Sequence, residues 1–122
     1  MRRLVAIGLI GLLVGCAAKA PKKDYSVTAC IADLNDANAD VRATAASVLG
    51  KYGAEAAPAV PALTKMLRDA NRKVRICAAY ALAEIGPDAR PAIPALRQAL
   101  NDQDRDVRDG AKYALKQLQP KS

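Results

Sequence analysis

The sequence predicts an all-α fold, an α-solenoid of three helical hairpins with about six helices. The first observation is a period, because the dipeptide Val-Arg begins at Val41, Val74 and Val107, a step of 33 residues. A fixed step of this length is typical of repeat proteins. The second observation is that apolar residues follow helical spacing within each copy and no segment alternates as a strand does. Each hairpin therefore has an apolar face that only a neighbouring copy can cover.

Other positions keep the same step and divide residues 26–122 into repeats of about 26–57, 58–90 and 91–122. Because several spaced positions recur together, the period is specific. The recurring sets are Leu34, Leu67 and Leu100; Asp36, Asp69 and Asp102; Ala45, Ala78 and Ala111; and Leu49, Leu82 and Leu115.

The first repeat begins at about Tyr25, and its first helix has apolar residues at helical spacing. In the second repeat, Pro61 lies in the first turn of a helix, where its missing N–H costs nothing. Asn71 is placed to cap a second helix from about Arg72 to Glu84, and Gly86 ends it. The third repeat begins near Pro91. The residues that carry these expectations are Val27, Cys30 and Leu34 on the first helix; Asn38 and Asp104 at the other cap positions; and Val74, Ala78, Ala81, Leu82 and Ile85 on one apolar stripe.

The first residues, MRRLVAIGLIGLLVGCAAKA, have the layout of a secretory signal, with two arginines and an apolar run too short to span a bilayer. The tetrapeptide LVGC resembles the lipobox of bacterial lipoproteins, which implies cleavage after residue 15 and acylation of Cys16. The alternatives are an ordinary signal peptide and an uncleaved anchor. Residues 16–25 then form the lipidated cysteine and a short tether. By analogy with Gram-negative sorting, Ala17 after the cysteine implies the outer membrane.

The charge of the folded part argues against a nucleic-acid binder. The chain carries +7, but two basic residues lie in the leader and a net charge of two lies in the tether, so the repeats carry about +3. Dedicated nucleic-acid binders are usually far more basic. We therefore expect no nucleic-acid partner.

Two cysteines besides Cys16 lie within the repeats. Cys30 and Cys77 stand where other repeats have core or near-core residues, so we expect small buried thiols. The alternative is a disulfide, which an exported compartment permits.

The repeats resemble the HEAT family, in the short form known from phycobilisome-lyase-like proteins. The resemblance rests on PAVPALTKMLRDANRKVRICAAYALAEIG and its counterparts PAIPALRQALNDQDRDVRDGAKYALKQL and LNDANADVRATAASVLGKYG. Thr28 and Gln119 depart from the pattern, since they replace the opening proline and the closing glycine. The resemblance implies a ladder between the turn aspartates and second-helix arginines of neighbouring repeats, formed by Asp36, Arg42, Asp69, Arg75, Asp102 and Arg108.

Catalytic and metal sites find no support in the sequence. The turn acids at residues 36–40 and 102–106 look like the start of a calcium loop, but the glycine and glutamate that such a loop needs are missing, so helix capping explains them. The chain has no histidine, which removes the paired His-Glu motifs of metal-dependent HEAT enzymes and the base of serine triads. We expect no catalytic residues, no metal, no cofactor and no enzyme activity.

The surface of the second helices is the remaining candidate site. We expect an arc opposite the apolar stripe to line the concave side, with Tyr80 and Tyr113 as neighbours across one step. It serves either as a partner-binding surface or as an inter-repeat seam. The arc contains Ala43, Ala46, Ser47 and Gly50; Ile76, Ala79, Tyr80 and Ala83; and Asp109, Lys112, Tyr113 and Lys116, with Ile76, Tyr80, Asp109, Lys112, Tyr113 and Lys116 as the candidate partner-binding residues.

The sequence thus predicts a lipid-anchored, exported HEAT-like module that binds or scaffolds another protein at the cell envelope. Two alternatives are a bilin-lyase-like chromophore-handling protein and a purely structural envelope component. Three hairpins are near the minimum for a stable stack, so its open ends are expected to need a protein partner or a second copy.

Overall fold

The computed structural model describes residues 23–120, and this part of the chain is helical without strands, as predicted. The leader, Cys16 and most of the tether lie outside the described residues. In chain order the elements are α2 (Val27–Asp33), α3 (Ala39–Lys51), the 3₁₀ helix η2 (Gly53–Ala59), α4 (Val60–Met66), α5 (Arg72–Ile85), the 3₁₀ helix η3 (Pro87–Ala92), α6 (Ile93–Ala99) and α7 (Arg105–Leu118).

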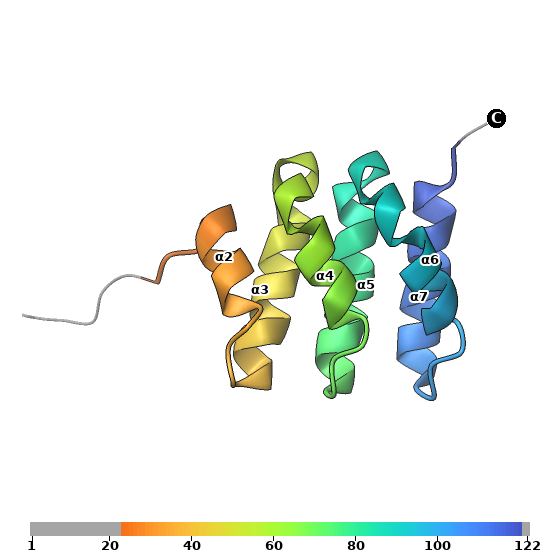
Figure 1. The fold of residues 1–122 in the computed structure, drawn as a ribbon, viewed down its shortest axis with the longest axis horizontal. Helices are drawn as coiled ribbons and strands as arrows, with labels where there is room; N and C mark the ends of the chain where they lie inside the picture. Colours follow the sequence, from red (N-terminus) through yellow and green to blue (C-terminus); the bar gives the residue numbers. More distant parts are fainter. Residues whose placement is uncertain (1–22, 121–122) are drawn as a thin grey trace, which may run out of the picture.

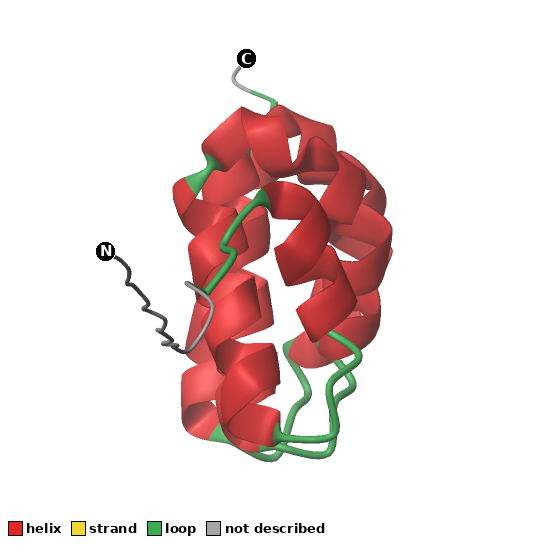
Figure 2. Ribbon diagram, turned by 90° about the vertical axis from the view of Figure 1, so that its left-hand side faces the viewer, coloured by secondary structure: helices red, strands yellow, loops and turns green. Residues whose placement is uncertain are grey.

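The three hairpins stand side by side in chain order (Figure 1). Their first helices, α2, α4 and α6, form one layer, and their longer second helices, α3, α5 and α7, form the other (Figure 2). The second helices make most contacts between repeats, because α5 packs against both α3 and α7. The predicted solenoid of three hairpins is confirmed. None of the helices in residues 23–120 is long and apolar enough to cross a membrane.

The predicted caps define where the second helices begin. The side chains of Asn38, Asn71 and Asp104 each accept a hydrogen bond from a backbone N–H in the first turn of the next helix. These bonds satisfy donors that have no partner within the helix. At the other end of α5, Gly86 has a φ of 89°, a conformation that glycine adopts without a Cβ penalty. The helix extends through Ile85, one residue beyond the predicted end.

Leucines form the centre of the core. Six of them are fully buried, and no polar or charged side chain among the described residues is fully buried. The predicted stripe along α5 is also buried, from Val74 to Ile85, with at most 2% of each side chain exposed. Burial of one leucine contributes about 1.5–3 kcal/mol, so these residues supply much of the driving force for stacking. The six are Leu34, Leu49, Leu63, Leu82, Leu96 and Leu118.

The connections between hairpins are 3₁₀ helices, which the sequence reasoning did not predict. In η2, Ala56 and Ala59 are fully buried, and in η3, Ala89 and Ala92 are fully buried. In a helix of three residues per turn, residues three apart point in the same direction. The connections therefore contribute to the core.

Candidate protein-binding surface

The turn aspartates and second-helix arginines join successive repeats. Arg42 donates from Nε and Nη2 to the two carboxylate oxygens of Asp69, at 2.9 and 3.1 Å. Arg75 Nη2 donates to Asp102 Oδ1 at 3.3 Å, and its Nε lies 3.0 Å from Oδ2 without its N–H pointing at that oxygen. Each arginine also donates to a carbonyl oxygen of its own turn. One guanidinium therefore fixes both the local turn and the position of the next repeat.

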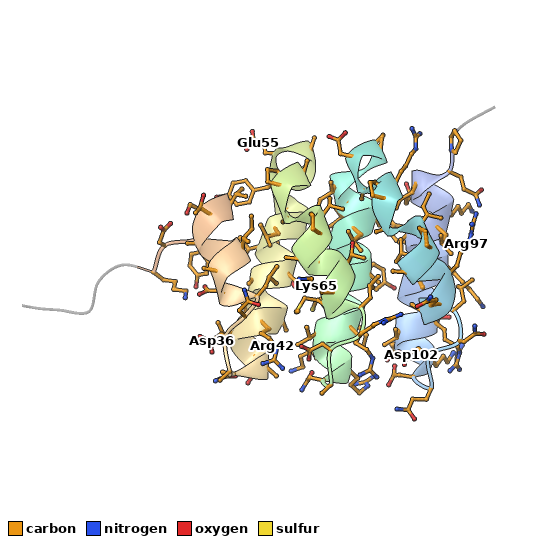
Figure 3. All side chains as sticks on the ribbon, in the orientation of Figure 1. Asp36, Arg42, Glu55, Lys65, Arg97 and Asp102 are labelled. Atoms are coloured by element: carbon orange, nitrogen blue, oxygen red, sulfur yellow. The ribbon has the colours of Figure 1, made fainter. Side chains whose placement is uncertain are left out.

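The two end members of this ladder are Asp36 and Arg108. Among residues 23–120, neither has a ladder partner in a neighbouring repeat. The Asp36 carboxylate accepts the backbone N–H of Asn38, and Arg108 donates to the Asp102 carbonyl oxygen. Figure 3 shows Asp36, Arg42 and Asp102 along the same edge of the stack. Ladder side chains within the seams are largely buried, with 9–16% exposed. Their geometry holds the repeats in register.

The titration of Asp69 reflects its place in the ladder. Burial by itself raises the pKa of this carboxyl, but the hydrogen bonds from the Arg42 guanidinium and the Asn71 N–H lower the pKa below its ordinary value. The side chain is therefore a carboxylate at neutral pH.

Two exposed tyrosines form a pair on the layer of second helices. The ring centroids of Tyr80 and Tyr113 lie 5.5 Å apart with a tilt of 37°. Their side chains are 40% and 45% exposed. Tyr80 also covers Gly110, since a Cβ added there would lie 3.1 Å from Tyr80 Cε2. One side of this ring thus closes the seam between α5 and α7, while part of the pair faces solvent.

The small residues of the predicted arc lie in the seams between repeats. Ala46 and Ala79 are fully buried, and Ala43 and Ala83 are 5% and 6% exposed. These side chains lie in the seams, where neighbouring second helices pack closely. The arc is therefore divided: small residues close the seams, while the tyrosines and the polar residues of α7 remain exposed.

A hollow of about 260 Å³ opens between α3 and α5. Ser47 stands 33 residues before Tyr80, so the first repeat has a serine where the second has a tyrosine. No ring from α3 therefore covers this space. Lys51 and Glu84 bring opposite charges to its lining, and Ala81 is buried beneath. The sequence analysis did not predict this hollow. Its signal was the serine at a position that holds a tyrosine in the second and third repeats. Its lining consists of Ser47, Lys51, Ile76, Cys77, Tyr80, Ala81 and Glu84.

The exposed side of α7 is charged. Asp109, Lys112 and Lys116 are exposed, and Asp109 lies 3.7 Å from Arg105 one turn earlier. Lys112 precedes Tyr113 on this helix, and Lys116 follows it by three residues. The candidate surface therefore consists of an aromatic pair, an adjoining hollow and a basic rim.

The remaining chemistry-bearing residues do not converge. Cys30 is buried and Cys77 is half-buried, and the structure has both as free thiols. Within residues 23–120, no group of three or more cysteine, aspartate or glutamate side chains is placed to hold a metal ion. In the turn that resembled a calcium loop, the Asp36 and Asn38 side chains accept backbone N–H groups instead.

The stacked hairpins define an α-solenoid repeat protein. Residues 27–116 match the model of HEAT repeats, so the match covers most of the chain. The chain therefore belongs to the HEAT repeat family. Comparison with curated proteins gave no match.

Solved structures share this fold. A crystal structure of an engineered protein is 28% identical, with a TM-score of 0.65, over 75% of this chain and 44% of that chain. The structure of human deoxyhypusine hydroxylase in complex with glycerol is 35% identical, with a TM-score of 0.64, over 75% of this chain and 31% of that chain. The chain thus spans less than half the length of either protein.

Proposed function

We propose that this chain is an exported, lipid-anchored HEAT-repeat module that binds another protein through the exposed surface of α3, α5 and α7. The observation that supports it most is the Tyr80–Tyr113 pair, 5.5 Å between ring centroids, next to an open hollow. Tyrosine is one of the residues enriched at the centres of protein interfaces. The basic rim of α7 favours a partner with an acidic border.

The module acts by binding and not by catalysis. Its ladder carboxylates are held by arginines and backbone N–H groups, and the chain has no histidine to serve as a base. The hydroxylase activity belongs to the human protein and is not carried over to this chain, which spans 31% of its length.

The anchor is proposed from the leader alone, and it has its own test. Cells that express the chain are fed an alkyne-labelled fatty acid, and the purified protein is examined for the label. We expect labelling of the wild type, no labelling of Cys16→Ser and full labelling of Cys30→Ser. Equal labelling of the wild type and Cys16→Ser would show that Cys16 is not the acylated residue.

The binding surface is tested by photo-crosslinking in cells. A photoreactive amino acid replaces Ser47 in the hollow or, as a control, Lys65, an exposed residue on α4 in the opposite layer (Figure 3). We expect one defined crosslinked protein from position 47 and none from position 65. The same products from both positions would contradict a specific surface on the second helices.

A further inference from the structure

We propose that the N-terminal end face of the stack pairs with the same face of a second copy around a two-fold axis, with the two α3 helices antiparallel. The end face is the side of α3 that points away from α5. Tyr80 and Tyr113 take no part in this pairing, although Lys51 borders both the end face and the hollow beside Tyr80. On α3 the end face consists of Asp40, Val41, Thr44, Val48, Lys51 and Tyr52, and Tyr25 and the Lys23–Asp33 ion pair border it.

The end face repeats a surface that is buried elsewhere in the stack. Val74 and Val107, which stand 33 and 66 residues after Val41, are fully buried. Their helices, α5 and α7, each pack against the preceding second helix. In residues 23–120 no second helix precedes α3, so Val41 and Val48 are only half-buried. The end face therefore has the character of a seam without its covering helix.

Two opposite charges mark the ends of this face. Asp40 and Lys51 lie in the first and last turns of α3, eleven residues and about 16 Å apart. Their equivalents in α5 show which way these positions point. Lys73 reaches back to within 3.8 Å of Asp40, and the Glu84 carboxylate lies against Gly50. Both positions thus reach the preceding repeat across the open side of a seam, and in α3 they lie at the rim of the end face, where Asp40 also lies near Lys73 and Lys51 also lines the hollow beside α5.

This charge pattern fits an antiparallel copy. When the two α3 helices run in opposite directions, Asp40 of each copy lies opposite Lys51 of the other, and Val41, Thr44 and Val48 lie between the two ion pairs. A parallel arrangement would place like charges opposite each other, which disfavours association. A two-fold contact satisfies both copies at once and stops at two.

The other end of the stack is not suited to cover this face. On α7, Lys112 and Lys116 occupy the positions that Ala46 and Gly50 fill in the first seam. A head-to-tail contact would bury both lysines and would bring Lys116 close to Lys51 of the next copy. The ladder ends, Arg108 and Asp36, would gain an ion pair like those within the seams, but burial of two lysines without partners would cost more than one such pair contributes.

The end face belongs to one hairpin, so it is smaller than the roughly 800 Å² per partner of a stable interface. We therefore expect a weak pair, with a dissociation constant on the order of 100 µM in solution. Concentration on a shared surface would favour the paired form.

Sedimentation equilibrium of the full chain, in density-matched detergent up to about 0.5 mM, tests the pairing. We expect a monomer–dimer equilibrium that Asp40→Lys and Lys51→Asp each weaken by about tenfold or more, because each places like charges opposite each other. The double variant Asp40→Lys/Lys51→Asp restores the ion pairs in reverse order and should return to within about threefold of the wild type. Lys65→Asp, on the other layer, is the matched control and should not change the association.

Three results would overturn the proposal. The first is a monomer at all concentrations, which would mean that residues 1–22 or another partner covers the end face. The second is growth beyond two copies, which indicates head-to-tail stacking. The third is a double variant that associates no better than the single variants. Circular dichroism of each variant establishes that a loss of association is not a loss of folding.

Discussion

Arg42 and Asp69 join the first and second repeats through two hydrogen bonds of 2.9 and 3.1 Å, while Asp69 also accepts the N–H of Asn71 at 2.9 Å. One carboxylate thus closes its own turn and receives the preceding repeat. Because both side chains are at most 16% exposed, the pair is shielded from solvent more than a surface ion pair is.

Asp69→Asn removes the charge from this pair and leaves a polar group of the same shape. The amide oxygen can still accept the Asn71 N–H, but the Arg42 guanidinium loses its carboxylate. We expect a loss of about 1–3 kcal/mol in the free energy of unfolding, measured with urea. Asp36→Asn is the control, because the Asp36 carboxylate accepts the Asn38 N–H within its own turn but has no arginine from a neighbouring repeat. This change should cost less than about 0.5 kcal/mol. Equal losses would show that the ladder does not stabilise the stack.

The lowered pKa of Asp69 also predicts a pH dependence. The carboxyl binds protons less readily in the folded state than in the unfolded state, whose pKa is about 3.9. The stabilisation is therefore complete above that value and is lost as the pH falls through the lower, folded pKa. Between about pH 5 and pH 2, the wild type should lose more unfolding free energy than Asp69→Asn. Parallel curves for the two proteins would rule out this contribution.

Gly50 lies at a close approach between α3 and α5. A Cβ at this position would lie 3.0 Å from Ala81 Cα, which is backbone and cannot move aside, and it would also clash with the Glu84 carboxylate. We expect Gly50→Ala to destabilise the fold by about 1–3 kcal/mol, despite the better helix propensity of alanine. Ser47→Ala, on the same helix but exposed, should change stability by less than about 0.5 kcal/mol. A stabilised Gly50→Ala protein would mean that the seam is looser than described.

Ser47→Tyr should fill the hollow with a third tyrosine in the column formed with Tyr80 and Tyr113. A ring there can pack beside Tyr80, as Tyr113 does on the other side, and gain about 0.5–1.5 kcal/mol in unfolding free energy. The proposed partner should then bind more weakly, because its site is occupied. Lys65→Tyr adds a tyrosine on the opposite layer and should leave binding unchanged. Unaltered binding by Ser47→Tyr would exclude the hollow from the interface.

The repeat architecture could be predicted because each of its causes is local. The caps Asn38 and Asn71, the terminating Gly86 and the apolar stripe of α5 all act within one helix or turn, and these predictions were confirmed. The division of the surface could not be predicted in this way. Ala46 is fully buried and Ser47 is exposed, because the direction from which the next helix approaches decides which neighbour it covers. That direction depends on packing between helices, which the period alone does not specify.

The most direct test of the proposed binding surface is the crosslink from position 47 in the Tyr80→Ser/Tyr113→Ser variant, measured together with the melting temperature. If these tyrosines anchor a partner, the crosslink should fall by about tenfold or more while the protein remains folded with a similar melting temperature. A folded variant that crosslinks as well as the wild type, or a variant that unfolds because the tyrosines only seal the seam, would contradict the account.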